Sequence, residues 1–117
     1  MIRRASENKS YELPHFLNGK GTLEMLDIRL PEEMKPNGRK YALVTIPAGA
    51  SLGYHVHKGD AETYYILSGR GVYNENGTLV DVSAGDMMYC PDGEGHGIEN
   101  NSDEPIQMLA LILYTLK

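Results

Sequence analysis

The chain has 117 residues, with 11 Lys and Arg against 16 Asp and Glu and a formal net charge of -5. This length fits a single domain. An acidic chain without a cluster of Lys or Arg argues against nucleic acid or an anionic membrane surface as the main partner, because both require clustered positive charge. We therefore expect a small-molecule ligand.

The one cysteine, Cys90, excludes an internal disulfide and a cysteine-rich zinc module, and it fits a reducing compartment. No apolar segment of a signal peptide follows Arg3 and Arg4. The longest apolar stretch, Met108 to Tyr114, is far shorter than the roughly 20 residues of a transmembrane helix. These features predict a cytoplasmic protein with no membrane association.

Glycines and prolines divide the chain into short stretches rich in Val, Ile, Thr and Tyr, which is typical of an all-β domain. The expected strands are Thr22 to Ile28, Tyr41 to Ile46, Leu52 to His57, Glu62 to Leu67, Gly71 to Asn74, Thr78 to Val82, Met87 to Cys90, Gly97 to Asn100 and Gln107 to Tyr114.

Two local signals refine this pattern. The segment Pro31 to Pro36 predicts a single helical turn, because its prolines prevent a longer helix. The segment Asn74 to Gly77 predicts a tight hairpin turn, because Asn and Gly accept positive φ.

Apolar residues occupy consecutive positions in Tyr64 to Leu67 and in Leu109 to Tyr114, which predicts burial on both faces of these strands. A closed barrel with covered outer faces satisfies this pattern.

Three of the four histidines have a spacing that indicates a metal site. His55 and His57 lie on the same face of a strand, so their rings can converge on one ion. A short turn leads to Glu62, whose carboxylate returns beside His57 if the two strands pair, and a glycine-rich turn delivers His96. The His-x-His pair by itself is equally typical of two exposed strand residues.

The surrounding glycines favour the metal site, and they also indicate a family. The run from Gly49 to Gly69 resembles the first motif of the cupin superfamily, and the run from Gly85 to Asn100 resembles the second. Every signature position is occupied in both motifs, and the spacer from Arg70 to Ala84 has the short length usual in small microbial cupins.

This resemblance implies one double-stranded β-helix (cupin) barrel, jelly-roll-like, over residues 1–117. Residues 1–40 would form N-terminal strands and an arm, and 41–117 the barrel core with motifs at 49–69 and 85–100. It further implies that a divalent transition metal binds to His55, His57, Glu62 and His96, whereas Asn100 would have a structural role. These ligands accept Mn, Fe, Co, Ni, Cu and Zn, so the sequence does not identify the metal.

Strand alternation places Tyr64 and Ile66 on the same face as Glu62, so both should line a cavity below the metal. Tyr64 is the candidate proton donor and thus the candidate catalytic residue, and the alternative is a core aromatic. We expect Cys90 to be a small buried hydrophobe rather than a nucleophile, and His15 to lie at the surface or in an interface.

Three hypotheses describe the function. The first is a metal-dependent enzyme acting on a small organic acid or related molecule, as an oxygenase, decarboxylase or isomerase, because two coordination positions stay open. The second is a non-catalytic small-molecule binder or sensor. The third is a structural or storage protein. A separate alternative for the metal is that it only stabilises the barrel. With the metal as the only strong positive charge in the cavity, small carboxylates and α-keto or α-hydroxy acids are the expected ligands.

The resemblance also implies a twofold homodimer. The surfaces available to cover the outside of the barrel are the N-terminal segment, Tyr11 to Leu30, and the last strand, Gln107 to Leu116.

Overall fold

The computed structural model describes residues 1–115 and consists mainly of β-strands, so the all-β prediction is confirmed. The elements are η1 (Ala5–Glu7), β1 (Ser10–Pro14), η2 (Phe16–Asn18), β2 (Thr22–Arg29), α1 (Pro31–Met34), β3 (Gly38–Ile46), β4 (Ser51–Val56), β5 (Asp60–Ser68), β6 (Arg70–Glu75), β7 (Thr78–Ser83), β8 (Met87–Cys90), β9 (Gly95–Glu99) and β10 (Ile106–Tyr114).

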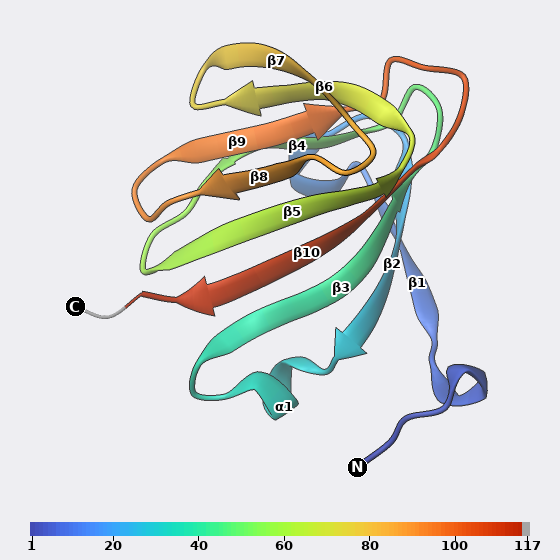
Figure 1. Ribbon diagram of the computed structural model, residues 1–117, viewed down its shortest axis with the longest axis vertical. Helices are drawn as coiled ribbons and strands as arrows, with labels where there is room; N and C mark the ends of the chain where they lie inside the picture. Colours follow the sequence, from blue (N-terminus) through green and yellow to red (C-terminus); the bar gives the residue numbers. More distant parts are fainter. Residues whose placement is uncertain (116–117) are drawn as a thin grey trace.

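Two antiparallel sheets face each other (Figure 1). The larger sheet has the strand order β1-β2-β3-β10-β5-β8, and the smaller has the order β4-β9-β6-β7. The end of β4, the start of β5 and the start of β9 meet at the same end of the molecule, on the left in Figure 1. Residues far apart in the sequence are therefore brought together at that end.

Most strand boundaries agree with those expected from the sequence, and both local signals are confirmed. The single helical turn is α1, which begins at Pro31. The hairpin joins β6 to β7, with Glu75 opposite Thr78 and with positive φ at both Asn76 and Gly77. Positive φ at these two positions matches the right-handed twist of the flanking strands.

Strand β1 was not expected from the sequence. It is a short edge strand that pairs with β2, with Tyr11 opposite Met25 and Leu13 opposite Leu23. All five of its residues are exposed or half-buried, and it ends in Pro14. The apolar alternation that would reveal a strand is therefore weak, and the pairing with β2 defines it.

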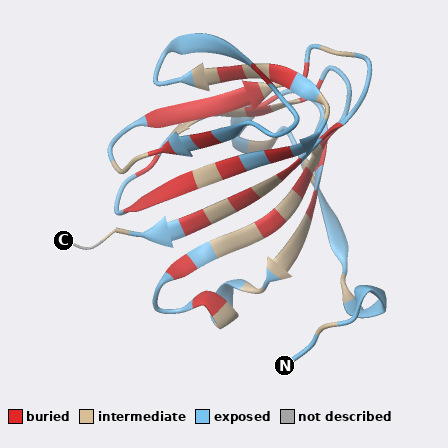
Figure 2. Ribbon diagram, in the orientation of Figure 1, coloured by how far each residue is buried: buried red, intermediate tan, exposed pale blue. Residues whose placement is uncertain are grey.

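The core lies between the two sheets and is built by the inward-facing side chains. Buried and exposed residues alternate along the larger sheet (Figure 2). The fully buried side chains include Val44, Tyr64, Ile66, Ile106 and Met108.

The prediction that strands are buried on both faces was wrong. Tyr64 and Ile66 are fully buried, but Tyr65 and Leu67 between and beside them are 42% and 47% exposed. The pleat sends successive side chains to opposite faces, and no helix covers the outer face of the larger sheet within residues 1–115. Consecutive apolar residues thus mark an exposed apolar outer face.

Candidate metal centre

The strand pairing gathers the four predicted donors at one end of the barrel. His55 in β4 lies directly opposite His96 in β9. The chain then turns at Gly59, which has a φ of 80°, and Glu62 follows in β5. One donor atom from each of His55, His57, Glu62 and His96 lies within 4.8 Å of the others.

The carboxylate of Glu62 is the centre of this cluster. Its Oε1 atom lies 2.9 Å from Nε2 of His96, 3.0 Å from Nε2 of His57 and 3.3 Å from Nε2 of His55. The Nε2 atoms of His57 and His96 are only 3.1 Å apart. All three imidazoles thus present the same ring nitrogen to one point.

The other ring nitrogen of each histidine has a protein partner. Nδ1 of His55 donates to the carbonyl of Gly53 over 2.9 Å. Nδ1 of His57 donates to Oδ1 of Asp60 over 2.7 Å. Such partners fix ring orientation and tautomer, so that Nε2 presents its lone pair.

The third outer contact comes from the neighbouring strand of the same sheet. Nδ1 of His96 lies 2.8 Å from the hydroxyl of Tyr73, which is in β6. Tyr64 stacks on the His96 ring, with ring centroids 4.7 Å apart and planes 8° from parallel. Tyr64 therefore packs on the face of the His96 ring, and Tyr73 contacts its outer nitrogen.

The electrostatics of the cluster favour a cation. Burial raises the pKa of Glu62, but the three histidines outweigh burial and hold its pKa well below the usual range. A hydrogen bond to the Glu62 carboxylate raises the pKa of His57, whereas burial lowers the pKa of His96. The cluster thus combines an ionised carboxylate with a neutral imidazole in a buried place.

This donor set fits a divalent transition metal. Imidazole nitrogen and carboxylate oxygen suit these ions, and several lone pairs directed at one point repel one another unless a cation lies between them. Nothing in the donor set distinguishes Mn, Fe, Co, Ni, Cu or Zn.

A cavity of about 220 Å³ adjoins the cluster, and His55, His57 and Glu62 line it. Most of its other lining residues are apolar, and two of them, Phe16 and Leu17, come from the segment η2. This segment packs directly on β4, because a side chain at Gly53 would overlap the carbonyl of Leu17. The cavity thus has one wall formed by the proposed metal ligands, and most of its other walls are apolar.

Of the two residues expected to line the cavity, Tyr64 does so and Ile66 packs in the core, outside the set of lining residues. Tyr64 is fully buried, and its hydroxyl has no hydrogen-bond partner. Burial, together with the nearby Glu62 carboxylate, raises its pKa well above the usual value, so the hydroxyl keeps its proton and is a donor. A buried donor without a partner costs about 1–3 kcal/mol, which a ligand oxygen would recover.

The expectation that a metal would be the only strong positive charge in the cavity was wrong. Arg39 and Lys40 also line the cavity. The sequence did not predict either residue, because the expected strand began at Tyr41, whereas β3 begins at Gly38. The sequence also did not predict Asp60 and Tyr73, which hold the outer nitrogens of His57 and His96.

The other singled-out residues contribute no donor to this cluster, although Cys90 lies directly opposite Glu62 in the sheet. Cys90 is 2% exposed, and burial raises the pKa of its thiol to about 11, so it has the character of a small hydrophobe. His15 is exposed. Asn100 is fully buried, and its amide donates to the carbonyls of Ile46 and Glu104, which is a structural role.

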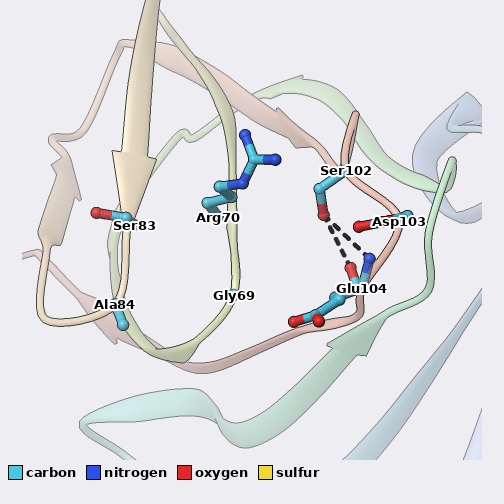
Figure 3. A pocket seen from close by; sticks show the side chains of 7 residues that line it. All are labelled: Gly69, Arg70, Ser83, Ala84, Ser102, Asp103 and Glu104. Atoms are coloured by element: carbon cyan, nitrogen blue, oxygen red, sulfur yellow. Dashed lines mark hydrogen bonds between the residues drawn. The ribbon is translucent and has the colours of Figure 1, made fainter.

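A larger hollow of about 460 Å³ lies beyond the far end of β5, beside Arg70 (Figure 3). Its charged residues, Arg70, Asp103 and Glu104, are all exposed, and Ser102 bonds to Glu104 along its rim. It lacks a buried titratable side chain among its described lining residues, so the chemistry is concentrated at the histidine cluster.

Comparisons with known proteins agree with this fold and cluster. The family model for the cupin domain matches residues 42–112, so the chain belongs to the cupin family. An oxalate-binding protein of Thermotoga maritima is 38% identical over 113 residues, which cover 97% of this chain and 93% of that protein.

Two further similarities concern decarboxylases. The crystal structure of a protein described as a predicted oxalate decarboxylase, from Thermotoga maritima, has a TM-score of 0.93 and 37% identity, over 98% of this chain and 100% of that one. The oxalate decarboxylase OxdC of Bacillus subtilis is 36% identical over 75 residues, which cover 60% of this chain and 20% of that enzyme. Within residues 1–115, no helix has the length and apolar character needed to span a membrane.

Proposed function

We propose that this cupin holds one divalent transition metal at His55, His57, Glu62 and His96 and uses it to bind a small dicarboxylate of the oxalate class. The observation that carries the proposal is the convergence of three Nε2 atoms on one carboxylate, beside a cavity. The similarity to an oxalate-binding protein over nearly the whole chain supports this choice of ligand.

The lining of the cavity favours an anion. Its apolar walls would strip water from a bound ligand, and a carboxylate loses its hydration unless a cation replaces it. Arg39 and Lys40 line the cavity, and Glu62 is the one acidic residue among the described lining residues. A bound divalent ion would add a Lewis acid with open coordination positions.

Tyr64 would contribute a hydrogen bond to the same ligand. Its hydroxyl is buried, protonated and without a partner. We propose that it donates to a carboxylate oxygen and so helps to orient the anion. This assigns the candidate catalytic residue a binding role.

Decarboxylation is the second candidate, and the similarity to oxalate decarboxylase over 75 residues favours it. Breaking the C–C bond of oxalate releases carbon dioxide, and the carbon left behind must take up a proton to become formate. Tyr64 holds its proton tightly because burial raises its pKa. We place binding first because the oxalate-binding protein is similar over 97% of this chain, against 60% for the oxalate decarboxylase.

The test compares metal-loaded with chelator-treated protein by calorimetry, with oxalate as the probe. We expect oxalate to bind the loaded form and to lose all measurable affinity for the metal-free form, since the metal supplies the main attraction. Equal affinity in both forms would refute the proposal.

Carbon-13 NMR of the metal-loaded protein mixed with oxalate separates binding from decarboxylation, because only decarboxylation yields formate. Elemental analysis of protein purified without a metal-affinity step identifies the ion.

We also propose a reducing, cytoplasmic compartment, where the free thiol of Cys90 stays reduced.

For the assembly we propose a twofold homodimer. The larger sheet exposes an apolar outer face, which includes Tyr65, Leu67, Met87, Tyr89 and Leu113. We propose this face as the interface, and the segment from Tyr11 to Leu30 stays the second surface expected from the sequence. The face includes the last strand as expected, although Leu116 lies outside the described residues.

Sedimentation tests the dimer. We expect twice the 13.0 kDa chain mass at micromolar concentration. Leu67→Asp should yield monomers, because a buried charge disrupts an apolar interface. The matched variant Leu79→Asp, at a 68% exposed position of the smaller sheet, should leave the dimer intact. A 13.0 kDa species for the unmodified chain would contradict the dimer.

A further inference from the structure

An irregularity in the pairing of β3 with β10 allows Arg39 to line the cavity in addition to Lys40. Ile112 pairs with Lys40, but the next residue, Leu113, pairs with Gly38. Arg39 is thus the extra residue of a β-bulge. Bulges redirect side chains, which explains how the adjacent residues Arg39 and Lys40 can line the same cavity.

Arg39 is tied to a proposed metal ligand through one shared carboxylate. Its Nε donates to Oδ2 of Asp60 over 2.9 Å, and Oδ1 of the same carboxylate accepts from Nδ1 of His57 over 2.7 Å. Asp60 is 5% exposed, so this bridge is buried at one end. It fixes the position of the guanidinium relative to His57.

The rest of the Arg39 guanidinium is available to a ligand. An arginine has five N–H donors in a planar fork, and within residues 1–115 only the Nε donor of Arg39 has a partner. Lys40 is engaged, because its Nζ lies 3.1 Å from both Oδ1 of Asp27 and the hydroxyl of Tyr11. Arg39 is therefore the lining cation with free donors.

We propose that Arg39 determines the specificity of the cavity for dianions. Its Nη donors would bind the carboxylate oxygens of the ligand that point away from the metal. The planar fork of a guanidinium can donate two parallel hydrogen bonds to the two outward oxygens of a chelated oxalate, one from each carboxylate. A monoanion that chelates the metal in the same way through a carboxylate and a hydroxyl oxygen leaves this fork one outward oxygen and no second negative charge. The inference rests on the proposed function and refines its ligand class.

The test measures the affinities of oxalate and glycolate for metal-loaded Arg39→Gln by calorimetry. Both ligands can chelate through a carboxylate and a neighbouring oxygen, but only oxalate has a second carboxylate. We expect oxalate affinity to fall about 10- to 100-fold, the range for lost charge-assisted hydrogen bonds. Glycolate affinity should change less than about 3-fold, and Arg39→Lys should restore part of the oxalate affinity.

Arg70→Gln is the matched control, because it removes the same charge from an exposed arginine beyond the far end of β5. It should leave both affinities unchanged. Metal content should also stay unchanged in Arg39→Gln, because Asp60 still holds His57.

Three outcomes would overturn the inference: equal losses for oxalate and glycolate, no loss for oxalate, or loss of the metal in Arg39→Gln. In each case, metal-dependent binding of oxalate to the unmodified protein would leave the proposed function standing. Failure of the unmodified, metal-loaded protein to bind oxalate would overturn both.

Discussion

We expect His57→Ala to reduce metal affinity by more than about 100-fold while the β fold stays intact. Loss of a residue that only orients a ligand costs about 10- to 100-fold in metal affinity, and loss of a ligand should cost more. The fold should survive, because the core between the sheets does not include His57. Elemental analysis measures the metal, and circular dichroism measures the fold.

Two further variants calibrate this result. Asp60→Asn weakens the contact to Nδ1 of His57 and should lower metal affinity by about 10-fold or more, but by less than His57→Ala. His15→Ala changes an exposed histidine outside the cluster and should have no effect. If His57→Ala and His15→Ala retain the same metal content, the proposed ligand set is wrong.

We expect Asn100→Ala to lower the free energy of unfolding by about 2–4 kcal/mol. The Asn100 amide bridges the carbonyls of Ile46 and Glu104, and its oxygen accepts from the backbone and the hydroxyl of Ser102. Each buried polar group left without a partner costs about 1–3 kcal/mol. The melting temperature should fall by about 10 °C, as thermal and urea unfolding would show.

The neighbouring residue provides the control for this prediction. Asn101 is exposed, so Asn101→Ala should change the free energy of unfolding by less than about 0.5 kcal/mol. Equal stabilities of Asn100→Ala and Asn101→Ala would mean that the bridge made by Asn100 contributes little. Because Asn100 lies outside the metal cluster, metal affinity should be unchanged in both folded variants.

Most of the fold could be predicted from the sequence, because turn residues mark the ends of its strands. The hairpin at Asn76 and Gly77 is an example, since positive φ at both positions defines the turn. The exposure of the outer face of the larger sheet could not be predicted in this way. Tyr65 and Leu67 have the apolar character of core residues, and only the arrangement of the sheets reveals that nothing in residues 1–115 covers them.

Part of the candidate site could likewise be predicted from the sequence, and part depends on the arrangement of the strands. The spacing of His55, His57 and Glu62 is local, so a strand and a turn suffice to predict their convergence. The partner of the outer nitrogen of His96 depends instead on strand pairing, because Tyr73 lies in β6, the strand next to β9. Arg39 depends on a bulge in the pairing of β3 with β10, which no local pattern in β3 reveals.

The carboxylate of Asp60 touches both halves of the proposed site, since it holds Nδ1 of His57 and Nε of Arg39. A proton or charge shift at one oxygen alters the electron density at the other, so the cation-binding and anion-binding sides share one group. Thermodynamic reciprocity then applies: whatever factor the metal adds to the affinity for a dianion, the dianion adds to the affinity for the metal. A dianion bound as proposed would therefore strengthen the hold of this small barrel on its metal.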